Sequence, residues 1–329
     1  MKPSPVRNSH SAFTLVELLV VIGIIAALAS LLLVAGGAAM RASREAAIKV
    51  GCTQLADGFQ AYTNDVSGGA YPPNMCIPAA ANPFDQFKRH FNKAFPKQRE
   101  PDALLAAIAT GVSNGNYQMN GTTGIGLSPY EAPVFWLGGF SDDPKYPISG
   151  PGGPSFRTTE IEDLGARTGF DFAQEQLAPK AADNTFDTSL GRYITYPDPR
   201  DNTVTRRINL WWYRPRNLTI PYAYFDTSAK PKGIVAYDGI GPIVALKTGG
   251  GNNYVVGNLR WANEGQCQIL SAGLDDAWGD FANEQMIVDW TDPTATYYGL
   301  IYPDGPWTGD LADTITNFST NRTLEDSQP

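Results

Sequence analysis

The chain has 329 residues, a formal net charge of −8 and 43% hydrophobic residues. This length fits one large domain or two small ones, and the apolar fraction is high enough for a buried core, which excludes a chain that is disordered throughout. The acidic balance argues against a nucleic-acid partner, and the three cysteines and two histidines do not have the spacing of a zinc site.

The first predicted element is an apolar helix that follows a short basic stretch. Residues 18–39 carry no charge and would measure about 33 Å as a helix, enough to cross a bilayer core of roughly 30 Å. Three interpretations are open: a secretory signal, a plain membrane anchor, or a leader followed by an anchor helix. The run is longer than the ~7–15 residues of a secretory signal. A plain anchor gives no reason for Glu17 at its start, where an acid is costly and therefore tends to be functional.

Residues 12–18 read Ala-Phe-Thr-Leu-Val-Glu-Leu and resemble the processing site of type IV pilins and type II secretion pseudopilins. In that family a prepilin peptidase removes a polar leader before a Phe and methylates the new amine, and Glu is the fifth residue of the mature chain. The resemblance implies cleavage between Ala12 and Phe13, N-methylation of Phe13 and an assembly role for Glu17. The family usually has Gly before the cut, whereas this chain has Ala12.

Elementary electrostatics agrees with that resemblance. Cleavage before Phe13 would create a positive amine at the start of a helix. The Glu17 carboxylate, one turn later, would oppose this amine or the amine of a neighbouring subunit, and it would complement the helix dipole. Within a bundle of low dielectric such a pair attracts strongly, whereas an unpaired Glu17 would be costly. We therefore predict that Glu17 is an assembly latch.

The helical pattern continues beyond the apolar run. An apolar stripe with helical spacing, followed by turn residues at 64–69, predicts a helix over residues 13–64, with the stripe packed on a head domain at 65–329. Gly23, Gly51 and Gly58 lower helix propensity by ~1 kcal/mol each and would permit bending. The exit from the helix, at residues 62–72, also resembles that of major pseudopilins. The stripe consists of Ile48, Cys52, Leu55, Phe59 and Tyr62.

The head is rich in Gly and Pro, which predicts short elements and long loops. Helices are predicted at 102–109 and at 132–137, the second after a capping box formed by Ser128 and Glu131. The predicted fold class is α+β and pilin-like: a long N-terminal helix, with a membrane-spanning first half, packs on a small antiparallel sheet, and a large loop-rich insertion occupies about 73–206. Strands are predicted at 208–213, 222–225, 234–237, 254–256 and 268–271.

A late loop, at residues 269–280, resembles the Ser-x-Gly-x-Asp loop of major pseudopilins, which holds calcium in several members. The resemblance implies that Asp275, Asp276 and Asp280 could supply some of the oxygens that calcium requires. The alternative is an Asx-type turn with solvated acids. A Cys76–Cys267 disulfide is a further expectation if the chain is oxidised.

These observations predict a structural subunit of a type II secretion pseudopilus or a type IV pilus rather than an enzyme. Its expected partners are other pilin subunits, a prepilin peptidase and the inner membrane. Residues 1–12 would be the leader, and the head would lie outside the cytoplasm. The protein is expected first in the inner membrane and then in a periplasmic pseudopilus or a surface pilus. The alternative is an adhesin-like minor pilin whose head binds a glycan, because Trp211 and Trp212 could form part of a sugar-binding face.

Overall fold

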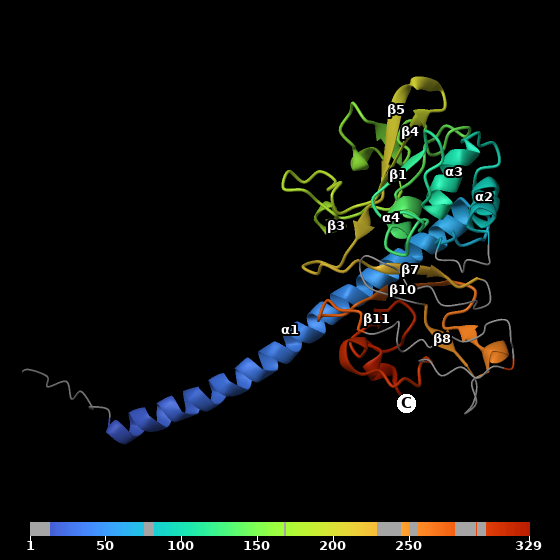
Figure 1. Ribbon diagram of the computed structural model, residues 1–329. Helices are drawn as coiled ribbons and strands as arrows, with labels where there is room; N and C mark the ends of the chain where they lie inside the picture. The colour runs from blue at the N-terminus through green and yellow to red at the C-terminus, as the bar shows by residue number, and fades with distance from the viewer. Residues whose placement is uncertain are drawn as a thin grey trace, which may run out of the picture. The chain divides into compact units, whose positions relative to one another are not determined.

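The computed structural model describes residues 14–75, 82–167, 169–228, 245–249, 255–279, 294 and 301–329. The chain divides into two compact units, Met1–Arg44 and Glu45–Pro329. Helix α1 (Leu15–Asp65) contributes to both units, and the predicted long helix is thereby confirmed. The second unit, called the head below, contains all the other helices and strands that the structure describes (Figure 1).

The part of α1 in the head carries the predicted apolar stripe. All five stripe residues, from Ile48 to Tyr62, are buried. The ring of Phe59 stacks on Tyr224 at a centroid distance of 3.9 Å. After Asp65 the chain leaves the helix through Gly68 and Gly69, which both have positive φ angles, and the Gly69 N–H donates to the Thr63 carbonyl at 2.7 Å. A residue without Cβ adopts such angles at no steric cost, which explains why the helix ends here.

Among the described residues, three short α-helices follow α1. Helix α2 (Pro83–Ala94) begins at Asn82, whose side chain accepts from the Asp85 N–H. Helix α3 (Asp102–Thr110) ends at Gly111, in the left-handed conformation, and α4 (Ala132–Leu137) is buried along its whole length. Both predicted helices of the head are therefore present. The reciprocal bonds of the capping box are also present, since Ser128 N–H donates to Glu131 Oε2 at 3.0 Å and Glu131 N–H to Ser128 Oγ at 3.2 Å.

The larger sheet of the head has four antiparallel strands in the order β1-β4-β5-β2. Their bounds are β1 Gln118–Asn120, β2 Ser155–Arg157, β4 Tyr193–Asp198 and β5 Asp201–Asn209. Alternate residues of β4 and β5, among them Ile194, Tyr196 and Ile208, are buried on one side of this sheet. Most of the sheet is formed by the predicted insertion, for which the sequence indicated loops.

A second sheet has three antiparallel strands in the order β11-β10-β7, with bounds β7 Ala223–Asp226, β10 Cys267–Ser271 and β11 Ile315–Thr316. It lies against the head portion of α1 (Figure 1), with the Phe59–Tyr224 stack between them. Two pairs of short strands complete the described sheets: β3 (Leu177–Ala178) with β6 (Trp212–Tyr213), and β8 (Lys247–Thr248) with β9 (Arg260–Trp261). A long helix with small antiparallel sheets is the predicted α+β pilin-like layout.

Some strand predictions need correction. The predicted strand at 208–213 is two strands, because β5 ends at Asn209 and β6 begins at Trp212. The Leu210 N–H donates to the Arg192 carbonyl at 3.0 Å and so continues the pairing with the segment before β4 by one residue beyond the end of β5. Of the strand predicted at 254–256, residue 254 lies outside the described residues, and Val256 begins a 3₁₀ turn (Val256–Asn258) instead of continuing a strand. The predictions at 222–225 and 268–271 are confirmed as β7 and β10, and 234–237 lies outside the described residues. Cys267 is a buried free thiol, and Cys76, its expected disulfide partner, lies outside the described residues.

Candidate functional site

The first turn of α1 is a second capping box. The Glu17 carboxylate accepts the Thr14 N–H at 2.9 Å and the Thr14 hydroxyl at 2.8 Å, and the Glu17 N–H donates to Thr14 Oγ1 at 3.2 Å. These bonds satisfy groups that a helix start leaves without intrahelical partners. The Thr-x-x-Glu spacing is a sequence signature of this cap, but Glu17 was predicted as an assembly residue that complements the helix dipole and not as part of a capping box. Ala12 and Phe13 lie outside the described residues.

The apolar side chains of α1 before the head are exposed on every side of the helix. Leu15, Leu32 and Leu33 are each at least 72% exposed, and the exposed large hydrophobic residues continue through most of the segment between them. By length and composition α1 is able to cross a membrane. A helix that is apolar all round requires either lipid or other apolar helices around it.

The loop that carries Asp275 and Asp276 already uses both carboxylates within the head. Asp276 accepts from the N–H groups of Thr219 and Ile220, at 2.7 and 2.8 Å, and from the Thr219 hydroxyl at 2.5 Å. It thereby fixes the turn before β7. Asp275 accepts the Ala277 N–H at 3.1 Å, and its own N–H donates to Asp313 at 3.2 Å.

Burial and the neighbouring carboxylates of Asp313 and Asp310 raise the pKa of Asp275 to about 6. A cation among these three acids would relieve their repulsion. Among the residues that the structure describes, however, no group of three or more His, Cys, Asp or Glu side chains is arranged to hold a metal. Asp280 lies outside the described residues, and calcium binding stays a prediction from the resemblance.

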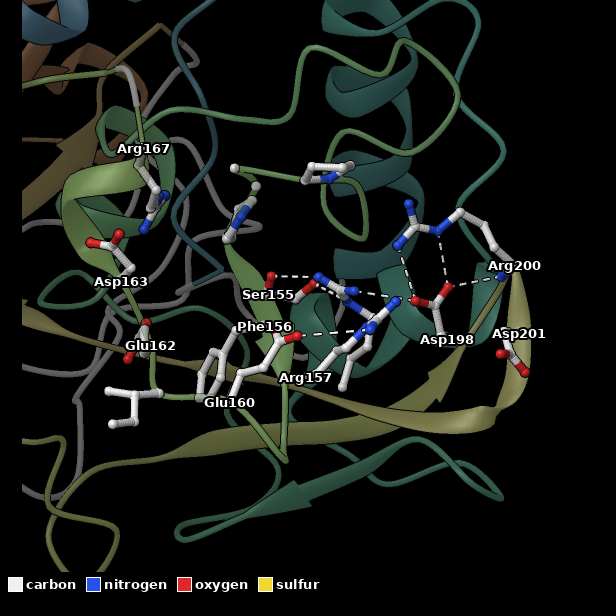
Figure 2. A pocket seen from close by; sticks show the side chains of 16 residues that line it. Ser155, Phe156, Arg157, Glu160, Glu162, Asp163, Arg167, Asp198, Arg200 and Asp201 are labelled. Atoms are coloured by element: carbon white, nitrogen blue, oxygen red, sulfur yellow. Dashed lines mark hydrogen bonds and ion pairs between the residues drawn. The ribbon is translucent and has the colours of Figure 1, made fainter.

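The head also carries two open clefts, lined by both polar and apolar groups, that the sequence did not indicate. The first, called the sheet-face cleft, has a volume of about 600 Å³ and includes Phe156, Asp183 and Arg207 in its lining. The second, called the hairpin cleft, has a volume of about 530 Å³ and extends to Asp198 and Arg200 at the β4–β5 turn. Residues 160–163 and Phe156 line both, so the clefts are neighbours. Figure 2 shows the hairpin cleft, with Glu162 and Asp163 at one end and the paired Asp198 and Arg200 at the other.

The two tryptophans that were predicted to form part of a sugar-binding face are buried or half-buried. Trp211 is 4% exposed; it meets Phe186 edge to face at a centroid distance of 4.9 Å and donates its indole N–H to Glu162 at 2.9 Å. It therefore supports the floor of the sheet-face cleft and does not offer a ring for stacking. Trp212 lies in β6 and is half-buried.

Comparison with known protein families gives one match. Residues 7–33 match the prokaryotic N-terminal methylation motif, which is the signature of type IV pilins and pseudopilins. No curated protein and no solved structure matches the chain. The matched range contains Ala12, Phe13 and Glu17 and runs into α1. The chain therefore carries the N-terminal segment of a pilin-like protein, and the predicted resemblance is confirmed at this segment.

Proposed function

We propose that this protein is a structural subunit of a type II secretion pseudopilus or a type IV pilus. The observation that carries the proposal is the methylation motif at residues 7–33, which continues into a helix that is apolar all round. Its partners would be a prepilin peptidase, which cuts between Ala12 and Phe13 and methylates Phe13, and other pilin or pseudopilin subunits, whose helices pack against α1. Such a subunit needs no catalytic centre, and we propose that the protein is not an enzyme.

The proposed location follows from the order of these steps. The chain would first be a single-pass inner-membrane protein, with its head outside the cytoplasm, and would then leave the bilayer for a periplasmic pseudopilus or a cell-surface pilus.

Calcium stays the one cofactor that the resemblance implies, and native mass spectrometry of the intact chain with and without added calcium tests its binding.

Glu17 has two possible roles that the capping box allows us to separate. Its carboxylate completes the first turn of the helix locally, and we propose that it also attracts the amine of Phe13 in its own or a neighbouring subunit. Gln at this position can still complete a capping box but has no charge. Ala in place of Thr14 removes the cap, at a cost of ~1 kcal/mol for the helix start, but keeps the charge.

We therefore expect Glu17→Gln to be processed and inserted normally but to be lost from filaments, and Thr14→Ala to be incorporated like the wild type. Mass spectrometry of the mature N-terminus reports processing, and the amount of the subunit in sheared or purified filaments reports assembly. A mature chain that starts elsewhere than at a methylated Phe13 would refute the pilin interpretation. Incorporation of Glu17→Gln at the wild-type level would refute only the latch.

A second role is compatible with the first. As a minor, adhesin-like subunit, the protein would also bind a glycan through its head. The observation that favours this role is the pair of clefts beside the four-stranded sheet, whose linings combine polar groups with apolar surface, because a subunit that only polymerises has no need of them. Binding of an oligosaccharide by the intact protein tests this role independently of assembly.

A further inference from the structure

One side of the four-stranded sheet is packed into the head, and the other side presents a polar and aromatic surface. Across the strands, Phe156 of β2 is opposite Arg207 of β5, which is opposite Thr195 of β4. Residues paired in this way have their side chains on the same side of the sheet. The Arg207 guanidinium lies 5.1 Å from the centre of the Phe156 ring and 5.4 Å from that of Tyr193. Cation–π contacts with both rings therefore help to fix the position of this arginine.

The loop at 160–165 covers part of this surface and forms one wall of the sheet-face cleft. Its Glu162 carboxylate accepts from the Asn209 side-chain amide at 2.6 Å and from the Trp211 indole at 2.9 Å. Burial raises the pKa of this carboxyl, and the two donors oppose that shift. Asn209 is the last residue of β5 and Trp211 follows two residues later, so these bonds attach the loop at 160–165 to the end of this strand.

The floor of the cleft has an acceptor and a donor that the head leaves unsatisfied. Asn209 is 6% exposed, and its side-chain oxygen has no hydrogen-bond partner among the described residues; the same is true of the Nε of Arg207. The two residues are two apart on β5, so their side chains lie on the same side of the strand. Buried polar atoms are nearly always paired. Both atoms are covered by protein, however, so they are not themselves contacts for a ligand, and the contacts that the cleft offers come from its exposed lining.

The lining of the cleft selects the class of ligand. Acids outnumber bases in the lining, so an anionic ligand would be repelled. The acids are Glu160, Glu162, Asp163 and Asp183, and the bases are Lys180 and Arg207. Amide and hydroxyl groups from Gln174, Asn184 and Thr185 add further donors and acceptors, and the half-exposed Phe156 offers an apolar surface. A volume of about 600 Å³ lies within the range of ~300–1,000 Å³ for small-molecule sites.

We propose that the sheet-face cleft binds a neutral oligosaccharide, with Phe156 beneath a sugar ring and Asp183 accepting from its hydroxyls. The neighbouring hairpin cleft shares the wall at 160–163, so a chain of several sugars could extend from one cleft to the other. This inference rests on the second proposed role and specifies its site and its ligand class. It does not depend on assembly.

The chain provides a matched control for the test. Asp183 accepts from the Thr185 N–H at 3.0 Å and the Thr185 hydroxyl at 2.6 Å. Asp187 makes the same kind of turn with Ser189, at 2.9 and 2.6 Å, but does not line either cleft. Replacing either acid by Ala removes the same local bonds, whereas only Asp183→Ala removes a cleft acceptor. Leu190, which is 67% exposed and outside both clefts, provides the control for Phe156.

The experiment is isothermal titration calorimetry on the full-length protein, in a detergent without a sugar headgroup. The probes are cellohexaose, maltohexaose, xylohexaose, mannohexaose and chitohexaose, with hexagalacturonic acid and a hexalysine peptide as charged comparators. We expect at least one neutral hexasaccharide to bind, Phe156→Ala and Asp183→Ala each to weaken its binding by about tenfold, and Leu190→Ala and Asp187→Ala to bind like the wild type.

Three results would overturn the proposal in different ways. Binding of none of the probes would overturn the glycan role and the site together, but not the filament role. Neutral binding that Phe156→Ala and Asp183→Ala leave unchanged would overturn only the site. Binding of hexagalacturonic acid or hexalysine alone would overturn the ligand class.

Discussion

Thr14–Glu17 and Ser128–Glu131 are the same capping box in two regions of the molecule. In both, the Glu carboxylate accepts the backbone N–H of the residue three positions earlier, and the Glu N–H donates to the hydroxyl oxygen of that residue. In the part of the chain that the structure describes, the Glu17 carboxylate accepts only from Thr14. Glu131 is 1% exposed and also accepts from the guanidinium of Arg192, with Nε at 2.9 Å.

The difference shows that a local motif does not determine the role of its acid. Glu131 is buried and saturated by a cation of the same chain, which makes it a structural group. Glu17 is exposed at the start of an apolar helix and keeps acceptor capacity, as a residue that binds a partner must. If this comparison is right, removing a charge in the head should cost folding free energy, whereas removing the charge of Glu17 should cost assembly.

The largest effect is expected when the cation of the head is removed. The side chains of Arg192 and Glu131 are 5% and 1% exposed. Arg192→Met would leave Glu131 charged in a low dielectric, and breaking such a buried pair costs about 3–5 kcal/mol. Chemical unfolding of the full-length protein in detergent, followed by near-UV circular dichroism, measures this loss.

A surface pair of the same chemistry is the control for this measurement. Arg216 and Glu175 are 2.7 Å apart but 71% and 57% exposed. Arg216→Met should change the free energy of unfolding by less than about 1 kcal/mol, because water screens the pair. Equal losses in the two variants would show that burial does not distinguish the two pairs.

The elements that the sequence predicted have a signal within a few consecutive turns, but α2, with its Asn82 cap and one buried face, has such a signal too and was missed. Helix α1 has a long apolar run and then an apolar stripe with helical spacing, and α3 and α4 are short apolar runs, the second after the Ser128–Glu131 capping box. Strands β7 and β10 are short runs of mostly apolar residues. The four-stranded sheet has no such signal. Strands β1 and β2 have three residues each, too few to show alternation, and they form because β4 and β5 pair with them.

Strand β5 was only partly predicted because a charged residue occupies an inward position. Arg206 is 5% exposed and donates to Asp198 at 3.2 Å and to the Ser155 hydroxyl at 2.8 Å. These partners come from two other segments, so a strand that appears polar in the sequence is half-buried in the fold. The sheet-face cleft was missed for the same reason, since its lining comes from segments far apart in the chain.

The second-largest effect is expected in the pH dependence of the stability of the head. His90 is 8% exposed, and its Nε2 lies 3.0 Å from the Tyr62 hydroxyl. Burial, with a smaller contribution from Lys93, lowers the pKa of His90 to about 4. In the unfolded chain this histidine takes up a proton below pH ~6.5, whereas in the folded head it does so only near pH 4. Stability should therefore fall as the pH is lowered through this window, by roughly 3 kcal/mol at most.

The test for His90 is a difference between two proteins. Burial raises the pKa of Asp226 to about 6, so this acid changes stability in the opposite direction over part of the same range. His90→Gln keeps a polar group near Tyr62 but does not titrate. The free energy of unfolding at pH 7.5 minus that at pH 4.5 should be larger in the wild type than in His90→Gln. The same difference in both proteins would contradict the assignment.

The smallest expected effect compares two glycines of one helix. A Cβ on Gly51 would lie 2.2 Å from the hydroxyl oxygen of Tyr222, which is itself buried, whereas a Cβ on Gly23 would have nothing within 4 Å. Gly51→Ala should therefore lower the free energy of unfolding by about 1–3 kcal/mol, the usual cost of overpacking. Gly23→Ala should leave the head unchanged and favour the helix by up to ~1 kcal/mol. Unfolding of the two variants under the same conditions distinguishes a glycine kept for packing from one that only makes the helix easier to bend. If Gly51→Ala were as stable as the wild type, Tyr222 would have room to move, and the bending role expected from the sequence would be the better explanation for Gly51.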